Sequence, residues 1–406
     1  MRIRTTAGLI IILCLSLFSL SVYSQYIDID YPTGDICPGD EVLFVNNSAN
    51  PGAHTWLWTF CKADPNEAPV GDPEINWDEL LQSPVYLSLN EDNGVFYSFI
   101  NNYSELEYNN NYPGKITRYT YPELDGLPQD PIDLIIAGMP KNLEGLQIVY
   151  DEYVTNKWYG FIVGGNPLYN SSYLARIDFG ASLDNPSPVL TMLVDDPGFT
   201  NLNFPHDLYI FYDDDNATWH GFTVNKGSGE VTRFDFNNGI NQVPDVENLG
   251  DFGGMLQEPV GIFPISELDG SVNNWHVFVT DYVGGLFRLD FGSDLLNSSP
   301  VCSSVTTTST QDILHMRDLS LFRSCNEIYG YIVSGANSSE YNLVSLRFDD
   351  ITQDPICTSY GTLGNSIEYG HSISDVFRVG SDYYAMICNI ATKNITRLIL
   401  PSCEAV

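Results

Sequence analysis

The sequence Leu286-Phe-Arg-Leu-Asp-Phe291 is one of six related phrases that recur along the chain. The intervals between successive copies are 58, 57, 55, 57 and 52 residues. Each copy alternates apolar with polar positions, which is typical of a β-strand with one buried face. The chain therefore repeats one structural unit six times. The five other copies start at Ile116, Leu174, Val231, Leu343 and Ile395.

Three further phrases accompany each copy and complete the unit. An aromatic phrase such as Trp158-Tyr-Gly-Phe-Ile162 precedes it, and an apolar segment such as Pro205-His-Asp-Leu-Tyr-Ile210 precedes that phrase. A fourth segment, such as Pro188-Val-Leu-Thr-Met-Leu193, follows. Four short strands in each of six repeats predict an all-β fold, a six-bladed β-propeller of four-stranded blades over residues 67–403. The alternative is an array of β-sandwiches, but a sandwich needs about 100 residues.

The end of the sequence predicts how the ring closes. Only six residues follow the last copy, Ile395–Leu400, so the sixth blade has three strands of its own. We expect its outer strand to come from Ala68–Gly71, before the first blade, because this pairing leaves no open sheet edge. Cys61 and Cys403 would then lie close together as a predicted disulfide. A Cys37–Cys61 pair is the alternative.

The N-terminal residues predict export. Arg2 and Arg4 precede the apolar stretch Leu9–Leu20, and small residues follow before Gln25. This order is typical of a cleaved signal peptide, which we assign to residues 1–24. The apolar stretch is short for a membrane span, and no later segment has the roughly 20 apolar residues that a transmembrane helix needs. We therefore expect a protein that is secreted or displayed at the cell surface, with the periplasm as an alternative.

The charge of the chain excludes one class of partner. Its 52 acidic and 17 basic residues give a net charge of −35 at pH 7. Nucleic acid is not an expected partner, because phosphate binding needs clustered Lys and Arg. The Cys and His residues lack zinc-ligand spacing, so we expect no cofactor and no zinc site. Acidic loop runs such as Asp195–Asp196 and Asp213–Asn216 leave calcium open, and we expect a monomer.

The segment before the repeats resembles the opening of a PKD-type β domain. The resemblance rests on Cys37-Pro-Gly-Asp-Glu-Val-Leu-Phe44 and on Trp56-Leu-Trp-Thr-Phe-Cys61, and we assign residues 25–66 to it. The repeats themselves resemble the propeller regions of large secreted Bacteroidota proteins that carry PKD or gliding-motility-associated C-terminal domains. That resemblance implies a secreted or surface propeller and implies no particular activity. No PKD array or sorting domain follows before Val406, so we expect a short member or a fragment.

Two sets of repeated residues are predicted to be structural. The arginine in five of the six repeat phrases is expected to pair with a carboxylate or with backbone carbonyls between neighbouring blades. The fifth copy carries Ser345 instead, and we expect Arg347 to replace the arginine there. The tryptophans of the aromatic phrase are expected to pack between blades. The residues are Arg118, Arg176, Arg233, Arg288, Arg397, Trp158, Trp219 and Trp275.

The innermost strand of each blade supplies the candidate ligand-binding residues. Aligning the six copies places Val85, Glu144, His206, Val260, Arg317 and His371 at one level, where the strands begin to line the central channel. The next level contains Asp207 and Asp318. Two His, one Arg and three carboxylates on one axis can bind an anion or a metal, or perform acid–base chemistry. A solvated polar channel is the alternative interpretation.

Tyrosines in the loops that join the second and third strands are further candidates. These loops combine Tyr with Asn and Ser, a composition that provides both stacking area and hydrogen bonds in binding loops. We expect them to lie on the same face as the channel mouth. Ordinary loop composition is the alternative. The tyrosines are Tyr103, Tyr108, Tyr112, Tyr169, Tyr173, Tyr282 and Tyr341.

These residues favour binding over catalysis. The sequence contains no GxSxG, HExxH or phosphate-binding glycine motif, so no catalytic residues are assigned. We expect a non-catalytic propeller that recognises a protein or carbohydrate through the loop-bearing face. A hydrolase or lyase that acts at the channel mouth is the alternative, and a structural spacer within a larger surface protein is another.

Overall fold

A computed structural model describes residues 29–30, 45–46, 68–74, 80–104, 112–166, 168, 170–269, 272–307, 313–324, 327–379 and 382–400. Several predictions lie outside these residues. They are the signal peptide, the cysteine pairs Cys61–Cys403 and Cys37–Cys61, and the loop residues Tyr108 and Tyr169. Of the PKD-like segment, only the short antiparallel pair β1 (Ile29–Asp30) and β2 (Val45–Asn46) is described.

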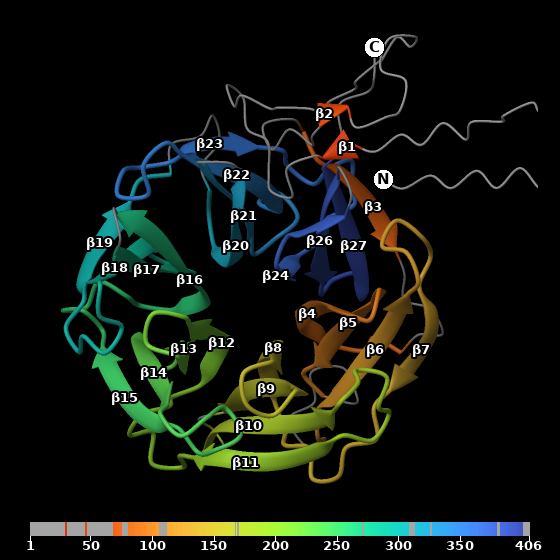
Figure 1. Ribbon diagram of the computed structural model, residues 1–406. Coiled ribbons are helices and arrows are strands. Elements are labelled where there is room, and N and C mark those ends of the chain that lie inside the picture. The colour runs from red at the N-terminus through yellow and green to blue at the C-terminus, as the bar shows by residue number, and fades with distance from the viewer. Residues whose placement is uncertain are drawn as a thin grey trace, which may run out of the picture.

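Six antiparallel sheets surround a central channel, as Figure 1 shows. The described residues contain strands, turns and bends but no α-helix, so none of them forms an apolar helix of membrane-spanning length. In five blades, successive strands run outward from the channel, and in the sixth the outermost strand comes from before the first blade. The predicted six-bladed propeller of four-stranded blades is therefore confirmed.

The strand bounds follow the six repeats. Blade 1 contains β4 (Pro84–Asp92), β5 (Val95–Asn102), β6 (Lys115–Tyr121) and β7 (Gln129–Asp133). Blade 2 contains β8 (Leu143–Asp151), β9 (Lys157–Asn166), β10 (Ser171–Gly180) and β11 (Val189–Asp195). Blade 3 contains β12 (Pro205–Asp213), β13 (Thr218–Asn225), β14 (Glu230–Phe236) and β15 (Asp245–Gly250).

The second half of the ring has the same organisation. Blade 4 contains β16 (Pro259–Asp269), β17 (Val272–Asp281), β18 (Gly285–Gly292) and β19 (Val301–Val305). Blade 5 contains β20 (Met316–Ser324), β21 (Glu327–Ser334), β22 (Asn342–Phe348) and β23 (Ile356–Ser359). Blade 6 contains β26 (Asp382–Asn389), β27 (Asn394–Leu400) and β3 (Val70–Glu74). Its innermost position is shared by β24 (Gly370–Ile373) and β25 (Phe377–Val379), which pair with successive parts of β26.

The ring closes through β3, the strand that precedes the first blade. It pairs antiparallel with β27, and its register runs from Val70 opposite Ile399 to Glu74 opposite Ile395. The Arg397 side chain reinforces the pairing, because its Nη2 donates to the Asp72 carboxylate at 2.7 Å. The predicted closing strand is therefore confirmed, although it starts at Val70 and extends to Glu74.

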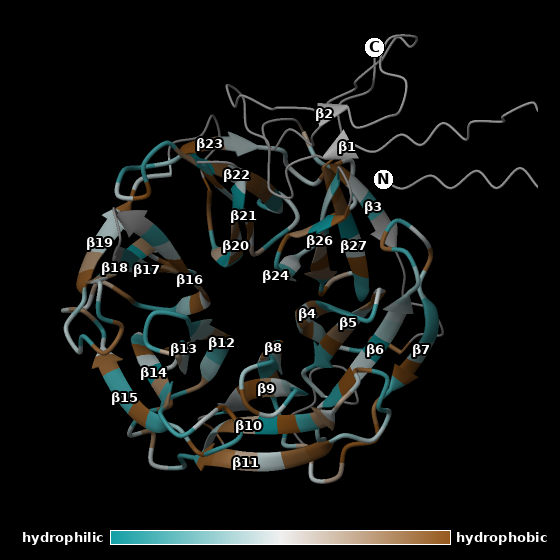
Figure 2. Cartoon of the chain, in the orientation of Figure 1, coloured by the Kyte–Doolittle hydropathy of each residue, from teal (hydrophilic) through white to brown (hydrophobic). Residues whose placement is uncertain are grey.

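The hydrophobic core lies between the blades. Each of the six buried apolar clusters draws its residues from two neighbouring blades, and together they complete the circle. Alternation within strands makes this possible, as the changing colours along β10 in Figure 2 show. Because successive side chains of a strand point to opposite faces, each sheet can pack against the blade before it and the blade after it.

The repeated arginines connect each blade to the next. Each guanidinium Nη1 donates to the carbonyl of a buried aliphatic residue in the loop between the third and fourth strands of the following blade. A buried carbonyl needs a hydrogen-bond partner, and a guanidinium supplies a charged donor. The prediction that these arginines bind carbonyls between blades is confirmed. The pairs are Arg118–Leu183 at 2.7 Å, Arg176–Ile240 at 3.2 Å, Arg233–Leu295 at 2.8 Å, Arg288–Ile351 at 2.8 Å and Arg397–Leu124 at 2.9 Å.

The fifth repeat lacks this arginine for a topological reason. Its Ser345 would face blade 6, whose fourth strand β3 comes from the other end of the chain. Blade 6 therefore has no connection from its third to its fourth strand that could accept a guanidinium. The prediction that Arg347 replaces the missing arginine is wrong. Its guanidinium pairs with Glu327 of β21 at 4.0 Å and with Asp349, directly after β22, at 3.4 Å, so both partners belong to its own blade.

The repeated tryptophans pack as expected. Trp219 contacts Tyr153 of the preceding blade with ring centroids 6.3 Å apart, and Trp275 contacts Phe211 at 4.9 Å. Trp158 belongs to the core cluster that blades 1 and 2 share. Their large apolar surfaces thus extend the interfaces between blades.

Replacing Arg233 should destabilise the fold much more than replacing Arg347. The Arg233→Met variant leaves the Leu295 carbonyl without its charged donor and the buried Asp235 carboxylate with His220 as its remaining partner, which we expect to cost about 2–4 kcal/mol. Arg347→Met removes a partly exposed pair and should cost less than about 1 kcal/mol. Urea unfolding measures both values. Equal losses would contradict a special role for the repeated arginine.

Candidate functional site

The channel mouth is built by the first residues of the six innermost strands. In every blade the pairing with the second strand shifts its register within the first four residues of the innermost strand, which marks a β-bulge or irregularity. Bulges redirect side chains next to functional sites. The second residues of these strands are Val85, Glu144, His206, Val260, Arg317 and His371, as the alignment predicted.

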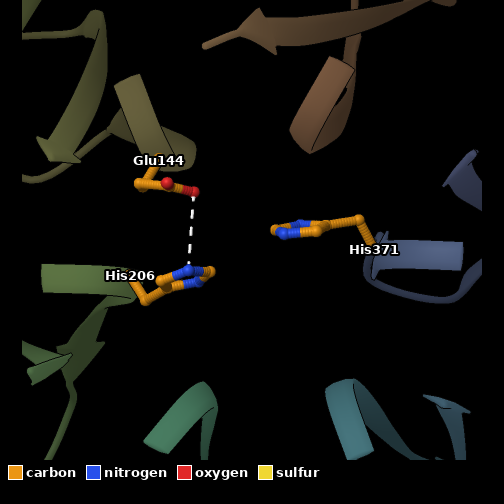
Figure 3. A group of neighbouring side chains, drawn as sticks. All are labelled: Glu144, His206 and His371. Atoms are coloured by element: carbon orange, nitrogen blue, oxygen red, sulfur yellow. Dashed lines mark ion pairs between the residues drawn. The ribbon is translucent and has the colours of Figure 1, made fainter. Parts of the chain in front are cut away.

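Three of these side chains converge and form what we call the channel-mouth triad: Glu144, His206 and His371. They come from β8, β12 and β24 and point toward one another (Figure 3). One oxygen or nitrogen from each lies within 4.8 Å of the others, and Glu144 Oε2 is 3.8 Å from His206 Nε2. All three are at most 5% exposed. The sequence alignment therefore identified residues that meet in space although they belong to different blades.

Hydrogen bonds to the far side of each ring fix the two imidazoles. His371 Nδ1 lies 3.1 Å from the Val85 carbonyl, which only accepts, so Nδ1 carries the hydrogen. The Tyr86 hydroxyl donates to the Val260 carbonyl and lies 3.0 Å from His206 Nδ1. Since that hydroxyl has used its hydrogen, His206 Nδ1 must donate to its oxygen. Both neutral rings therefore keep a lone pair on Nε2.

Burial determines the charge state of the triad. It lowers the pKa of both histidines well below the usual value, and the positive charges of Arg317 and Lys226 lower it further. Burial raises the pKa of Glu144 to about 8, against the opposing effect of Lys226 and Arg317. Glu144 Oε2 has no hydrogen-bond partner among the described residues. Near neutral pH the triad is thus a buried, uncharged set of two imidazoles and one carboxyl.

Asp207 and Asp318 connect neighbouring blades beneath the triad. The Asp207 carboxylate accepts the backbone N–H of Ile262 in blade 4 at 2.9 Å, and Asp318 accepts that of Ile373 in blade 6 at 2.8 Å. Sequence reasoning assigned both carboxylates to ligand binding alone and missed this contact. Each carboxylate lies more than fifty residues from its partner in the sequence, so only the three-dimensional structure reveals these contacts.

A small cavity lies below this level. Its volume is about 40 Å³, room for very few water molecules, and Asp207, Asp318 and Asp375 contribute to its lining. The Tyr209 hydroxyl donates to Asp375 at 3.1 Å. Burial raises the pKa of Asp207 to about 7, that of Asp375 to about 6, and that of Asp318 well above its usual range. These three carboxyls therefore stay protonated at pH values at which an exposed carboxyl is ionised.

Arg317 stands beside the triad within an aromatic rim, defined here as Tyr282, His315, Tyr341 and Tyr369. Its guanidinium lies 4.8 Å from the Tyr282 ring and 4.3 Å from the Tyr369 ring. Tyr369 stacks on Tyr341, and Tyr282 packs against His315. Cation–π contacts of this kind hold a guanidinium in place without removing its charge. All four rim rings are partly exposed.

The tyrosines predicted to bind ligand have different environments. Tyr282 and Tyr341 belong to the aromatic rim, and Tyr112 is exposed. The expectation is wrong for Tyr103 and Tyr173, whose side chains are buried. Tyr173 lies within β10, and its hydroxyl donates to the carbonyls of Lys141 and Asn142, so packing accounts for it.

Other rim residues were missed because they precede the innermost strands. His315 and Tyr369 lie immediately before β20 and β24 and have left-handed backbone conformations, with φ of 53° and 62°. Such φ values are unfavourable for bulky residues and often accompany functional sites. Lys226, another residue not predicted, lies with its Nζ 5.2 Å from the Tyr282 ring. His315 and Tyr369 share one sequence feature, a position directly before an innermost strand.

The acidic loops considered for calcium use their carboxylates locally. Asp196 accepts the backbone N–H groups of Asn201 and Leu202, and Asp213 accepts that of Asp215. These bonds are typical of turns in which a carboxylate caps its own loop. Calcium binding by these loops stays a prediction.

Comparison with solved structures finds the same fold in distant proteins. The allergen Mala s 1 of Malassezia sympodialis has a TM-score of 0.50 at 12% identity, covering 82% of this chain and 96% of that protein. NanB, solved with Optactamide, has a TM-score of 0.55 at 9% identity, covering 84% and 72%. A GH43 β-1,3-galactosidase with galactodeoxynojirimycin has a TM-score of 0.45 at 10% identity, covering 68% and 93%. At identities this low, the matches to Mala s 1 and NanB show the fold alone.

No family model and no curated protein matches the sequence. The resemblance to secreted Bacteroidota propellers therefore stays a prediction.

The buried carboxyls predict how stability depends on pH. Asp207 and Asp318 keep their protons in the folded state, whereas the unfolded chain loses them near pH 4. The contribution of these two carboxyls to the free energy of unfolding is therefore fully present below that pH. It decreases as the pH rises toward about 7, the pKa of Asp207. Asp318→Asn should flatten this decrease in urea unfolding measured from pH 4.5 to 7.5 (a range of about three units set by these pKa values). The exposed Asp349→Asn is the control, and parallel curves for wild type and Asp318→Asn would contradict the assignment.

Proposed function

We propose that this protein is an exported carbohydrate-binding propeller that holds its ligand over the channel mouth. The observation that carries the proposal is the aromatic rim around Arg317. Three tyrosine rings and one imidazole, all partly exposed, meet there beside the two cations Arg317 and Lys226. The basic and apolar start of the sequence supports export.

The rim has the chemistry that sugars require. A tyrosine offers an apolar ring face against which the C–H face of a sugar can pack, and a hydroxyl that hydrogen-bonds at the edge. Arg317 and Lys226 add N–H donors for hydroxyl or carboxylate oxygens. In a chain with net charge −35, two cations at one mouth mark a local departure from the acidic surface. Ligand sites in folds of this kind combine a concave apolar wall with a few fixed polar groups.

The rim also has a rigid foundation. Arg317 Nε donates to the Gly335 carbonyl, and its Nη2 donates to the Tyr369 hydroxyl. His315 Nδ1 lies 2.9 Å from Glu340. Side chains held by such contacts lose little entropy when a ligand binds, so the free energy of binding is larger. The rim therefore favours a prearranged binding surface.

Removing rim rings should weaken carbohydrate binding. We expect Tyr282→Ala and Tyr369→Ala each to reduce affinity about 10- to 100-fold, the loss for an aromatic contact worth about 1.5–3 kcal/mol. A glycan array with the full chain identifies the ligand, and calorimetry measures the variants. Tyr153→Ala is the matched control, because this exposed tyrosine lies in the turn between β8 and β9, at the opposite end of the strands.

Two outcomes would overturn the carbohydrate assignment. One is a ligand whose affinity is the same for wild type, Tyr282→Ala and Tyr369→Ala. The other is a protein ligand found in a parallel surface-protein screen while the glycan array stays blank.

A glycoside hydrolase or lyase acting at the same mouth is the second candidate. The convergence of Glu144 with two histidines in a buried, partly enclosed site favours it, because acid–base catalysis needs such a group beside the ligand. If it is correct, wild type converts a bound glycan to shorter or unsaturated products, and Glu144→Gln loses at least about 100-fold of that rate. Product analysis by mass spectrometry checks this. Binding without any product would leave the non-catalytic function.

A further inference from the structure

We propose that Glu144, His206 and His371 form a binding site for a divalent transition metal ion of the Zn²⁺ class. This inference goes beyond carbohydrate binding, because the site can be occupied whether or not a sugar lies above it. It rests on the donor atoms, their orientation and their burial.

The first argument is the unsatisfied carboxylate. Glu144 Oε2 is buried and has no hydrogen-bond partner among the described residues. His206 Nε2 is 3.8 Å away, which is beyond hydrogen-bond distance. A buried oxygen without a partner is costly, and a cation between the three side chains removes that cost.

The second argument is the orientation of the imidazoles. Metal-binding histidines usually donate their other ring N–H to a carbonyl or another acceptor, which fixes the ring and the tautomer. His371 does this with the Val85 carbonyl, and His206 does it with the Tyr86 hydroxyl, which is itself fixed by the Val260 carbonyl. Both rings thereby keep Nε2 as the free donor atom, and Figure 3 shows the two rings beside the Glu144 carboxyl group.

The third argument is distance. Ligand atoms in a tetrahedral zinc site lie about 3.3 Å from one another, given metal–ligand bonds of about 2.0–2.1 Å. The three donor atoms here lie within 4.8 Å, and one pair is at 3.8 Å. Rotations about side-chain bonds close a difference of this size without moving β8, β12 or β24.

The donor set also selects the metal. Two imidazoles and one carboxylate suit Zn²⁺ and its first-row neighbours, whereas Ca²⁺ prefers six to eight oxygens. Three protein ligands leave a fourth position, as in catalytic zinc sites, for water or for an oxygen of a bound ligand.

Sequence spacing could not reveal this site. Short zinc motifs place two ligands within a few residues on one element, but each ligand here comes from a different blade. Only ring closure brings the three together.

Wild type carries the first test. After removal of metal with a chelator, the full chain is dialysed against Zn²⁺ alone at about 10 µM, and bound metal is measured per chain. We expect about one Zn²⁺ per chain and a higher melting temperature, with no such effect from Ca²⁺. Less than about 0.2 Zn²⁺ per chain would overturn the proposal, whatever the glycan array shows.

Variants locate the ion. Glu144→Gln, His206→Ala and His371→Ala should each weaken Zn²⁺ binding at least about 100-fold, and Co²⁺ bound to wild type should show the visible absorption of a four-coordinate site. His276→Gln, a histidine of β17 paired with Asp290, is the control and should bind like wild type.

The Tyr86→Phe variant tests the site even if the triad variants fail to fold. It removes only the hydroxyl that orients His206, and should weaken Zn²⁺ binding about 10- to 100-fold while circular dichroism stays unchanged. Full Zn²⁺ affinity in the folded triad variants would place the ion elsewhere and overturn the proposal.

Discussion

The bond from one blade's arginine to the next blade's loop carbonyl is the interaction on which the ring depends. A blade buries its faces only against its neighbours, so its position must be specified by contacts across the interface. Apolar packing provides most of the driving force but has little directional preference. The guanidinium is directional, and it binds a backbone carbonyl that would otherwise be buried without a partner. The absence of this arginine at Ser345, where the next blade offers no receiving loop, shows that the residue follows the topology of the ring.

The fixed arrangement of the blades around the axis also creates the channel mouth. Once the blades are fixed around the axis, the second residue of every innermost strand faces the centre, and residues far apart in sequence become neighbours. Asp207 and Asp318 then act as links between inner strands, while Glu144, His206 and His371 meet above them. The polar inner level thus serves both as a joint between blades and as a chemical surface. Its buried carboxyls retain protons near neutral pH because burial between the inner strands removes them from water.

Repetition explains which parts of this structure could be predicted from sequence. Six copies of two phrases define the blades, the short sixth copy identifies the closing strand, and the alignment places His206, Arg317 and His371 on one level. The alignment does not show in which direction a side chain points. Tyr173 looks like a loop residue but lies in β10 with its hydroxyl on a carbonyl, and His315 and Tyr369 reach the rim through left-handed backbone conformations outside the repeated phrases. Arg347 shares a strand with Ser345, yet exposed carboxylates attract it.

The closing pair of β3 with β27 affects how the protein is made. Asp72 and Arg397 are 325 residues apart, so the outer edge of the sixth blade cannot form until β27 has left the ribosome. Until then β3 is an unpaired strand, and the face of blade 1 that belongs against blade 6 stays exposed. Such edges and faces invite aggregation, and contacts of long sequence separation form slowly. A chaperone that shields β3 and blade 1 during synthesis would therefore act on the slowest part of folding.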